Sequence, residues 1–156
     1  MALFVGEFEQ TIDAKHRMVI PSALREQIVP EEDGREFILV LSPDRHLWLY
    51  PDLSYRRLLA RLKPSPLPDR QSWKTRLLFA MARLVKPDKQ GRIVLPEKSM
   101  RRAAVSQAVT LVGDFDHIEI WPTDEWELHV QERLPVYGEM LYEAADRLRS
   151  ETTATD

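Results

Sequence analysis

Two segments of the chain combine short apolar runs with alternating apolar and polar residues, as β-strands do. The first segment consists of EFILVL at 36–41 and HLWLYP at 46–51, separated by Pro43 and Asp44. The second is AVTLVGDFDHIEIWP at 108–122, with glycine and aspartate near its middle. Because proline, glycine and aspartate favour turns, each segment predicts two strands joined by a short connection.

A shorter pattern of the same kind precedes the first strand pair. Residues 8–12 lead into a polar turn, and MVIP at 18–21 predicts a strand that ends at its proline. SALREQI at 22–28 follows, with apolar residues four apart and a serine in the position of a helix cap. We therefore expect strand, turn, strand and short helix before the first strand pair.

The sequence contains an internal repeat. DAKHRMVIP at 13–21 matches DKQGRIVLP at 88–96 with an offset of 75 residues, and HLWLYP at 46–51 matches HIEIWP at 117–122 with an offset of 71. The two motifs recur in the same order with only a small change in spacing, which is typical of a duplicated structural unit. We therefore expect two related halves that share one core.

Two helices are expected between the halves. Aspartates begin segments from 52 to about 62 and from 69 to about 84, and KPSPLP at 63–68 separates them with three prolines. The second segment carries an apolar stripe of residues four apart, which predicts a side that faces the core: Trp73, Leu77 and Met81.

Helices are also expected at the end of the chain. Thr123 can cap a helix that ends before Pro135, and residues 137–149 predict another, with apolar residues on one side. The final segment, SETTATD at 150–156, is expected to fray from this helix.

The composition excludes several classes of protein. The chain has no cysteine, so disulfides, thiolate zinc sites and cysteine nucleophiles are excluded. No apolar run approaches the roughly 20 residues of a membrane-spanning helix. The first residues carry no basic region before their short apolar stretch and so do not resemble a signal peptide. We expect a cytoplasmic protein with no membrane partner.

The net charge of −3 conceals a strong asymmetry along the chain. Residues 54–102 contain fourteen lysines and arginines against three acidic residues, whereas residues 123–156 contain three against nine. A basic region of this size is compatible with a polyanion partner, although charge alone does not separate a binding surface from a solvated helix face.

Each half places an aspartate and an arginine four residues apart, directly before an apolar strand, as DxxxR. Asp13 and Asp88 can organise their turns by accepting backbone N–H bonds and pairing with the arginine. The remaining polar residues of the turns are long donors that a strand connection does not require. A rigid turn with such donors suits DNA, because arginine can contact guanine and lysine can neutralise phosphate. The candidate DNA-binding residues are Lys15, His16, Arg17, Lys89, Gln90 and Arg92.

The motifs FVGEFEQTIDAKHRMVIP, HLWLYP, DKQGRIVLP and HIEIWP, in this order, resemble the MraZ family. The resemblance covers about residues 3–134. It implies an α+β fold that is mainly a β pseudo-symmetric barrel of two AbrB-type, swapped-hairpin, double-psi-like repeats with peripheral helices. The implied division is a first repeat at 5–53, bridging helices at 54–84, a second repeat at 85–130, and a C-terminal helix and tail at 131–156.

The same resemblance implies a function. It implies a nucleoid-associated transcriptional regulator that forms a ring-shaped homo-oligomer. Such a regulator binds short direct repeats in double-stranded DNA upstream of the division and cell-wall gene cluster. The DNA contacts of the family map onto Asp13, Lys15 and Arg17, and onto Asp88 and Arg92. One residue departs from the family pattern, because His16 stands where glycine is usual while Gly91 is kept in the second copy. Histidine tolerates a positive φ better than most residues, so the turn is expected to survive with a bulkier tip.

The alternative functions are an enzyme and an oligomeric interaction module. An enzyme is disfavoured because the five glycines form no phosphate-binding loop and the four histidines are dispersed. The repeat accounts for His46 and His117 without metal or catalysis, so no metal, cofactor or small-molecule substrate is expected. The second alternative is an oligomeric interaction module that binds a protein or RNA. Its aromatic residues, however, are typical of core or interface positions: Trp48, Tyr50, Trp121 and Trp126.

Overall fold

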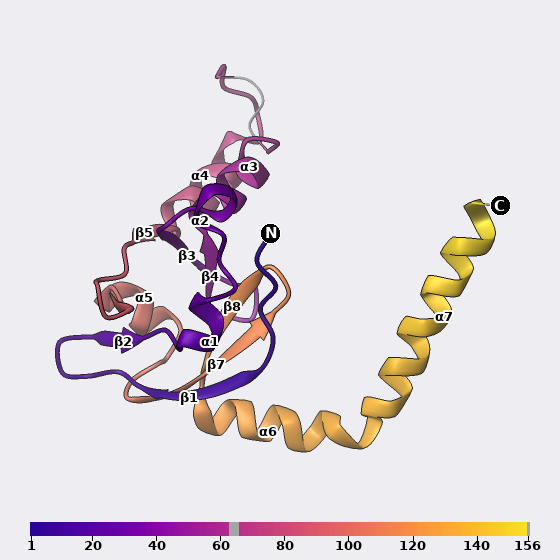
Figure 1. Ribbon diagram of the computed structural model, residues 1–156. Coiled ribbons are helices and arrows are strands. Elements are labelled where there is room, and N and C mark those ends of the chain that lie inside the picture. Colours follow the sequence, from indigo (N-terminus) through magenta and orange to yellow (C-terminus); the bar gives the residue numbers. More distant parts are fainter. Residues whose placement is uncertain (63–65, 156) are drawn as a thin grey trace. The chain divides into compact units, whose positions relative to one another are not determined.

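The computed structural model describes residues 1–62 and 66–155 and contains one six-stranded sheet and one two-stranded ribbon (Figure 1). The order of strands in the sheet is β1-β7-β8-β4-β3-β5, the ribbon pairs β2 with β6, and every pair is antiparallel. The strands are β1 Glu7–Thr11, β2 Arg17–Val19, β3 Phe37–Leu41, β4 Leu47–Pro51, β5 Arg83–Val85, β6 Arg92–Val94, β7 Ala108–Asp114 and β8 His117–Pro122.

The strand order shows how the two repeats share one sheet. The first strand of the first repeat, β1, pairs with β7 of the second repeat, and β5 of the second pairs with β3 of the first. The two hairpins meet where β4 pairs with β8. Each repeat therefore supplies an edge strand to the hairpin of the other. The predicted class, α+β and mainly β with two related repeats and peripheral helices, is confirmed.

The repeated histidine and aromatic residues meet where β4 pairs with β8. In this register Trp48 lies opposite Glu119. His46 stacks on Trp121 with ring centroids 3.9 Å apart, and His117 stacks on Tyr50 at 5.0 Å. Each histidine thus packs on the aromatic residue of the other repeat, which explains in packing terms why HLWLYP and HIEIWP carry the same residue types at the same positions.

One core contains side chains from both repeats. Phe4, Phe37 and Leu49 are almost completely buried, and so are Ile93 and Ile118 from the second half. Full burial of one such side chain stabilises the fold by about 1.5–3 kcal/mol. Neither repeat can supply this core alone, because its first strand belongs to the sheet edge of the other.

The segment before β1 crosses closely over β7. Phe4 and Phe115 exchange backbone hydrogen bonds of 2.8 and 3.0 Å, and the N–H of Gly113 donates to the carbonyl of Gly6. A Cβ atom at Gly113 would lie 2.5 Å from the backbone nitrogen of Val5. Only glycine allows two backbones to approach this closely.

We expect Gly113→Ala to lower the free energy of unfolding by about 1–3 kcal/mol, because the contacting backbone must move to admit the methyl group. Urea unfolding followed by circular dichroism measures the effect. Gly138→Ala is the control, since nothing lies within 4 Å of a Cβ there and alanine favours the helix by up to about 1 kcal/mol. Equal unfolding midpoints for the parent and Gly113→Ala would contradict the close approach.

In the described part of residues 1–122, five helices surround the strands. They are α1 Ser22–Arg25, α2 Pro30–Asp33, α3 Asp52–Leu59, α4 Ser72–Ala80 and α5 Glu97–Arg102. The helix expected at 22–28 is present but shorter, and its cap residue is Pro21 without a side-chain cap bond. The helix expected from Asp52 is α3, which ends at Leu59 rather than near Leu62. The segment KPSPLP at 63–68 is expected to separate the two helices with its prolines. Its residues 63–65 lie outside the described residues.

The helix expected from Asp69 to about Leu84 is wrong at both ends. Its helical part is Ser72–Ala80, and residues 83–85 form strand β5. Asp69 instead organises the preceding turn, where its carboxylate accepts the N–H of Gln71 at 2.7 Å. The physical reason for the strand is the sheet edge, because Val85 is buried when it pairs with Phe37.

The prediction that the stripe on α4 faces the core is also wrong for the single chain. Trp73 is 61% exposed and Leu77 is 59% exposed, and no residue of α4 is buried. Leu77 and Met81 instead line an open hollow of about 410 Å³ beside Trp48. The chain therefore presents apolar surface on this helix.

Residues 124–156 form a second compact unit, separate from residues 1–123. The chain here continues as α6 Thr123–Arg133, a short 3-10 helix at Leu134–Val136, and α7 Tyr137–Thr155. The two predicted helices are confirmed. The expected fraying is wrong for residues 150–155, which belong to α7, and residue 156 lies outside the described residues. Hydroxyl groups in this turn donate to carbonyls four residues earlier, as Thr152 does to Leu148 at 2.9 Å. No helix among the described residues has the length and apolar character needed to span a membrane.

Candidate nucleic-acid interface

The first DxxxR turn connects β1 to β2 and is held by one carboxylate. Oδ1 of Asp13 accepts the backbone N–H groups of Lys15 and Arg17 at 2.9 and 2.8 Å. Oδ2 accepts Nε–H of Arg17 at 2.7 Å. The N–H of His16 donates to the carbonyl of Asp13 at 2.9 Å, which closes the turn. Asp13 thus fixes both the backbone and the arginine side chain.

The second turn, between β5 and β6, has the same geometry. Oδ1 of Asp88 accepts the N–H groups of Gln90 and Arg92, each at 2.9 Å, and Oδ2 accepts Nε–H of Arg92 at 2.7 Å. The N–H of Gly91 donates to the carbonyl of Asp88 at 3.0 Å. Two segments 75 residues apart therefore form turns with the same pattern of hydrogen bonds.

These hydrogen bonds change the acidity of both carboxyl groups. The backbone N–H of Arg17 is the main cause that holds the pKa of Asp13 below its ordinary value, and the guanidinium contributes as well. Arg92 lowers the pKa of Asp88 in the same way. Both aspartates are therefore ionised at neutral pH and hold their arginines as charged pairs.

The clasp occupies only one nitrogen of each arginine. Among the described residues, the aspartate is the side-chain partner of each guanidinium, through Nε. Among the described residues, the clasp does not use the Nη groups, which form the bidentate contact to guanine. The side chains of Arg17 and Arg92 are 34% and 33% exposed, so each is partly fixed and partly open to a ligand.

The ribbon joins the two turns into one unit. In the pairing of β2 with β6, Arg17 lies opposite Val94 and Arg92 lies opposite Val19. This register separates the arginines by roughly 7 Å along the ribbon. The carbonyl of His16 accepts the N–H of Leu95 at 2.8 Å, and the carbonyl of Gly91 accepts that of Ile20 at 2.9 Å. The structure thus brings all six candidate residues to one ribbon: Lys15, His16, Arg17, Lys89, Gln90 and Arg92.

The tips of the two turns differ at His16 and Gly91. Both have a positive φ, 62° at His16 and 78° at Gly91, so the expectation that histidine adopts this conformation is confirmed. Arg25 explains why the second turn keeps glycine. Its Nε donates to the carbonyl of Ile20 at 2.8 Å, and the same nitrogen would lie 2.5 Å from a Cβ at Gly91. The corresponding position in the second repeat is Met100, which lines an open hollow with His16.

Sequence reasoning missed two basic residues near the turns. Arg25 packs over the second turn, and Arg101 lines the hollow of about 410 Å³ that also contains Asp13 and His16. The signal for Arg101 was present in the basic segment EKSMRR, but its position beside the first turn depends on the exchange of strands between repeats.

We expect His16→Gly to preserve the fold and to stabilise it by up to about 1 kcal/mol, because a non-glycine residue at positive φ costs roughly 1–2 kcal/mol and glycine loses more backbone entropy on folding. Gly91→Ala is expected to destabilise the protein by about 1–2 kcal/mol at its φ of 78°. Chemical unfolding of the two variants measures both effects. A large loss of stability in His16→Gly would show that the histidine side chain is needed for folding.

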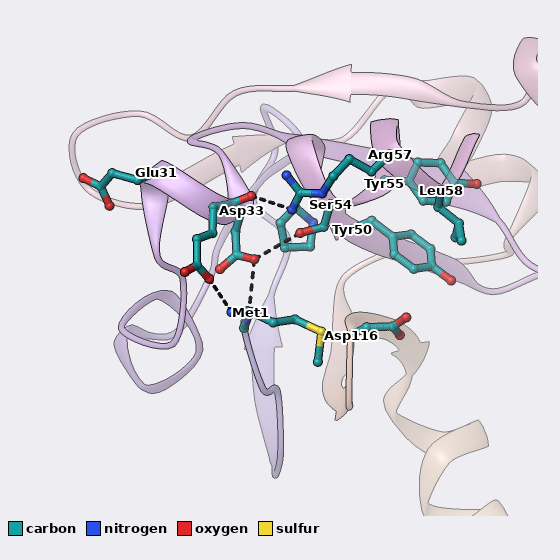
Figure 2. Close-up of a pocket in the computed structure, with 12 residues that line it drawn as sticks. Met1, Glu31, Asp33, Tyr50, Ser54, Tyr55, Arg57, Leu58 and Asp116 are labelled. Atoms are coloured by element: carbon teal, nitrogen blue, oxygen red, sulfur yellow. Dashed lines mark hydrogen bonds and ion pairs between the residues drawn. The ribbon is translucent and has the colours of Figure 1, made fainter. Parts of the chain in front are cut away.

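A third hollow, of about 570 Å³, lies beside α2 and α3 (Figure 2). Its buried carboxylate, Asp33, accepts hydrogen bonds from the Ser54 hydroxyl at 3.0 Å and from the backbone of Val29 at 2.9 Å. Burial raises the pKa of Asp33, but these hydrogen bonds outweigh it and hold the pKa below its ordinary value. Arg57 donates to the carbonyl of Glu32. These groups are engaged in holding the fold, so the hollow has the features of a structural crevice.

The exchanged strands and the paired aspartate-held turns define a duplicated swapped-hairpin protein. The chain matches the family model described as "MraZ protein, putative antitoxin-like" over residues 3–74 and 78–137. The chain therefore belongs to the MraZ family.

Several relatives are similar over most of the chain, and each is named transcriptional regulator MraZ. The protein from Clostridium tetani is 34% identical over 126 residues, covering 80% of this chain and 85% of the relative. The protein from Heliobacterium modesticaldum is 31% identical over 146 residues, covering 92% and 98%. The protein from Carboxydothermus hydrogenoformans is 30% identical over 147 residues, covering 94% and 99%.

Proposed function

We propose that this chain is a sequence-specific DNA-binding regulator of transcription that acts as a ring-shaped homo-oligomer. The DNA sites are short direct repeats upstream of the division and cell-wall gene cluster. The observation that carries the proposal is the pair of turns with the same clasp, each of which fixes an arginine through Nε and does not use its Nη groups. A prearranged arginine loses less side-chain entropy when it binds a base edge.

The six residues of the turns have different roles in this proposal. Arg17 and Arg92 contact guanine O6 and N7, and Gln90 suits adenine. Lys15 and Lys89 neutralise phosphates, and His16 at the tip of the first turn contacts the DNA backbone. Asp13 and Asp88 hold the turns rather than contact DNA, since a carboxylate would be repelled by phosphate.

Apolar surface that the chain leaves exposed supports the proposed assembly. Trp73, Leu77 and Leu78 on α4 are exposed, and so are Leu141 and Tyr142 on α7. Surfaces of this kind are typical of subunit contacts. In a ring, each subunit presents one ribbon, and once one has bound, its neighbours are at high effective concentration over the adjacent repeats. Direct repeats spaced near one turn of the duplex suit this arrangement.

The names of the relatives support a regulator of transcription rather than an enzyme. A cytoplasmic protein associated with the nucleoid is part of the same proposal. The alternative is an interaction module that binds RNA or a protein, and one observation favours RNA. Lys74 lies over the exposed ring of Trp73 at 5.7 Å, and such a pair can serve as a stacking platform.

A binding titration at several fixed salt concentrations tests the proposal. The full chain is titrated against a duplex from upstream of the cell-wall gene cluster and against a scrambled duplex of equal length. We expect at least a 1,000-fold preference for the first, as specific regulators show, and an affinity that falls steeply with salt. Equal affinity for both duplexes would overturn the proposal, and preference for single-stranded RNA would support the alternative.

A further inference from the structure

A cluster of ionisable side chains lies at the turn between β7 and β8, outside the DxxxR turns. Asp114 and His117 are paired across the hairpin. Glu119 is two residues beyond His117 on β8, so its side chain lies on the same face of the strand. One carboxylate oxygen or ring nitrogen from each of the three residues lies within 4.8 Å of the others.

Acidic side chains surround the imidazole of His117. Its Nδ1 lies 2.8 Å from Oδ1 of Asp116, and its Nε2 lies 2.8 Å from Oε2 of Glu119 and 3.8 Å from Oδ2 of Asp114. Three carboxyl groups therefore surround one imidazole. His117 and Glu119 are 7% and 8% exposed, so water screens their interaction weakly.

The first repeat shows that the hairpin does not require this cluster. Its histidine, His46, is equally buried and stacks on an aromatic residue in the same way. The positions that match the three acidic residues, however, are occupied by other residue types: Ser42 lies across the turn, Arg45 precedes the histidine, and Trp48 follows it by two residues. Folding of the repeat thus explains the histidine, and the three acidic residues of the second repeat need another reason.

We propose that Asp114, His117 and Glu119 form a binding site for a divalent transition-metal ion of the Zn²⁺ type. Zn²⁺ binds imidazole nitrogen at 2.0–2.1 Å and carboxylate oxygen at 2.0–2.2 Å, which places tetrahedral ligand atoms roughly 3.3 Å apart. The distances from Nε2 to the two carboxylate oxygens, 2.8 and 3.8 Å, lie on either side of this value. Small side-chain movements therefore complete the site.

The groups behind the three ligands match the outer contacts that such sites use. A metal-binding histidine commonly donates its second ring N–H to a carboxylate, which fixes the tautomer. Asp116 occupies this position at Nδ1 and leaves Nε2 for the ion. Trp121 donates Nε1–H to Oε1 of Glu119 at 2.9 Å and leaves Oε2 for the ion. Both buried ligands are thus already oriented.

The electrostatics of the cluster favour a bound cation. Three carboxylates concentrate negative charge around His117, and both His117 and Glu119 are buried. A divalent ion supplies positive charge that balances these carboxylates. A mixed set of one nitrogen and two oxygens favours Zn²⁺ over Mg²⁺, which prefers oxygen alone.

Calorimetric titration of the full chain, without an affinity tag and after removal of metals with a chelator, tests the site with Zn²⁺ as the probe. We expect one Zn²⁺ per chain and a rise of roughly 5–10 °C in the unfolding midpoint at a free Zn²⁺ concentration of about 100 times Kd. Asp114→Asn and Glu119→Gln are expected to weaken binding at least tenfold. Asp114 is exposed, so its replacement leaves the fold intact.

Asp44→Asn is the matched control, because Asp44 is an exposed carboxylate in the corresponding turn of the first repeat. It is expected to bind Zn²⁺ as the parent does. The absence of saturable Zn²⁺ binding in the parent would overturn the proposal. Equal affinity in the parent, Asp114→Asn and Glu119→Gln would also overturn it, because the ion would then be held elsewhere. A midpoint raised by Mg²⁺ but not by Zn²⁺ would overturn the assignment of the ion.

Discussion

Arg17→Ala is expected to lower the affinity for the specific duplex by roughly 10–100-fold, because one bidentate contact to guanine contributes about 1–3 kcal/mol of discrimination. Affinity for the scrambled duplex falls less, since it rests on phosphate contacts that lysines also make. The clasp makes the effect large. Asp13 holds Arg17 through Nε at 2.7 Å, so no other side chain can easily replace a prearranged guanidinium. The preference for the specific duplex therefore falls with the affinity.

The measurement is a fluorescence anisotropy titration of both duplexes at one fixed salt concentration. Arg45→Asn is the matched control, since Arg45 is an exposed arginine on another turn of the same repeat and asparagine tolerates its φ of 62°. Its affinity for the specific duplex is expected to stay within about threefold of the parent. Size-exclusion chromatography checks that both variants assemble as the parent does. Unchanged affinity of Arg17→Ala for the specific duplex would contradict base contact by this residue.

Arg92→Ala offers a test of the symmetry between repeats. Its clasp has the same distances as that of Arg17, so the same direction of effect is expected. The tips of the turns differ, however, because His16 occupies the place of Gly91. A bulkier tip allows a different approach to the groove. The ratio of the losses in Arg17→Ala and Arg92→Ala therefore shows how the two repeats divide the contacts with DNA.

Repeated motifs made much of the fold predictable from sequence. Turn residues separate the apolar segments of both hairpins, and the matching residues of HLWLYP and HIEIWP are those that stack across β4 and β8. The DxxxR turns were also predictable, because the carboxylate of Asp13 accepts hydrogen bonds from the residues two and four positions ahead of it. Local geometry is encoded by local spacing, and in both cases the spacing is short.

Strand β5 shows where this kind of prediction stops. RLV at 83–85 follows a helical pattern and has two exposed residues, so nothing within it indicates a strand. Its conformation is decided by the sheet edge of the other repeat, where Val85 pairs with Phe37. Similarly, the stripe on α4 has the spacing of a core-facing helix, yet the single chain leaves it exposed. Periodicity shows that a helix has an apolar side but not what covers that side.

The cluster around His117 could be predicted from the sequence only in part. The sequence DFDHIE places acidic residues on both sides of the histidine, which is a visible signal. Two facts needed the structure. Asp114 reaches His117 only because the hairpin pairs them directly, and Glu119 is buried only because β8 is a central strand. Comparison with the first repeat then separates the histidine, which both repeats share, from the acidic residues that only the second repeat has at these positions.

Asp13→Ala is expected to lower both the unfolding temperature and the affinity for the specific duplex. The alanine removes the acceptor of two backbone N–H groups and the partner of Nε, so the turn loosens and Arg17 loses its fixed position. The loss in specific affinity is expected to reach roughly tenfold, within the range for Arg17→Ala, because a mobile arginine must be ordered when it binds. Thermal unfolding identical to the parent would contradict the clasp.

Asp13→Asn separates the two parts of the clasp. Its amide oxygen can still accept the backbone N–H groups of Lys15 and Arg17, but the charged pair with Nε is lost. We expect Asp13→Asn to keep more stability than Asp13→Ala, while both lose affinity for the specific duplex. Equal stability of the two variants would show that the backbone hydrogen bonds contribute little.

The pH dependence of unfolding tests whether the ionised carboxylate of Asp13 stabilises the folded chain. The pKa of Asp13 in the folded chain lies below its ordinary value of 3.8, chiefly because the N–H of Arg17 donates to the ionised form. The resulting stabilisation is fully present above the unfolded pKa and is lost as the pH falls through the folded pKa. Unfolding midpoints of the parent and Asp13→Asn, measured between about pH 7 and pH 3, should therefore differ by a constant amount at neutral pH and converge in acid. A difference that persists undiminished at the lowest pH would show that ionisation of Asp13 does not stabilise the turn.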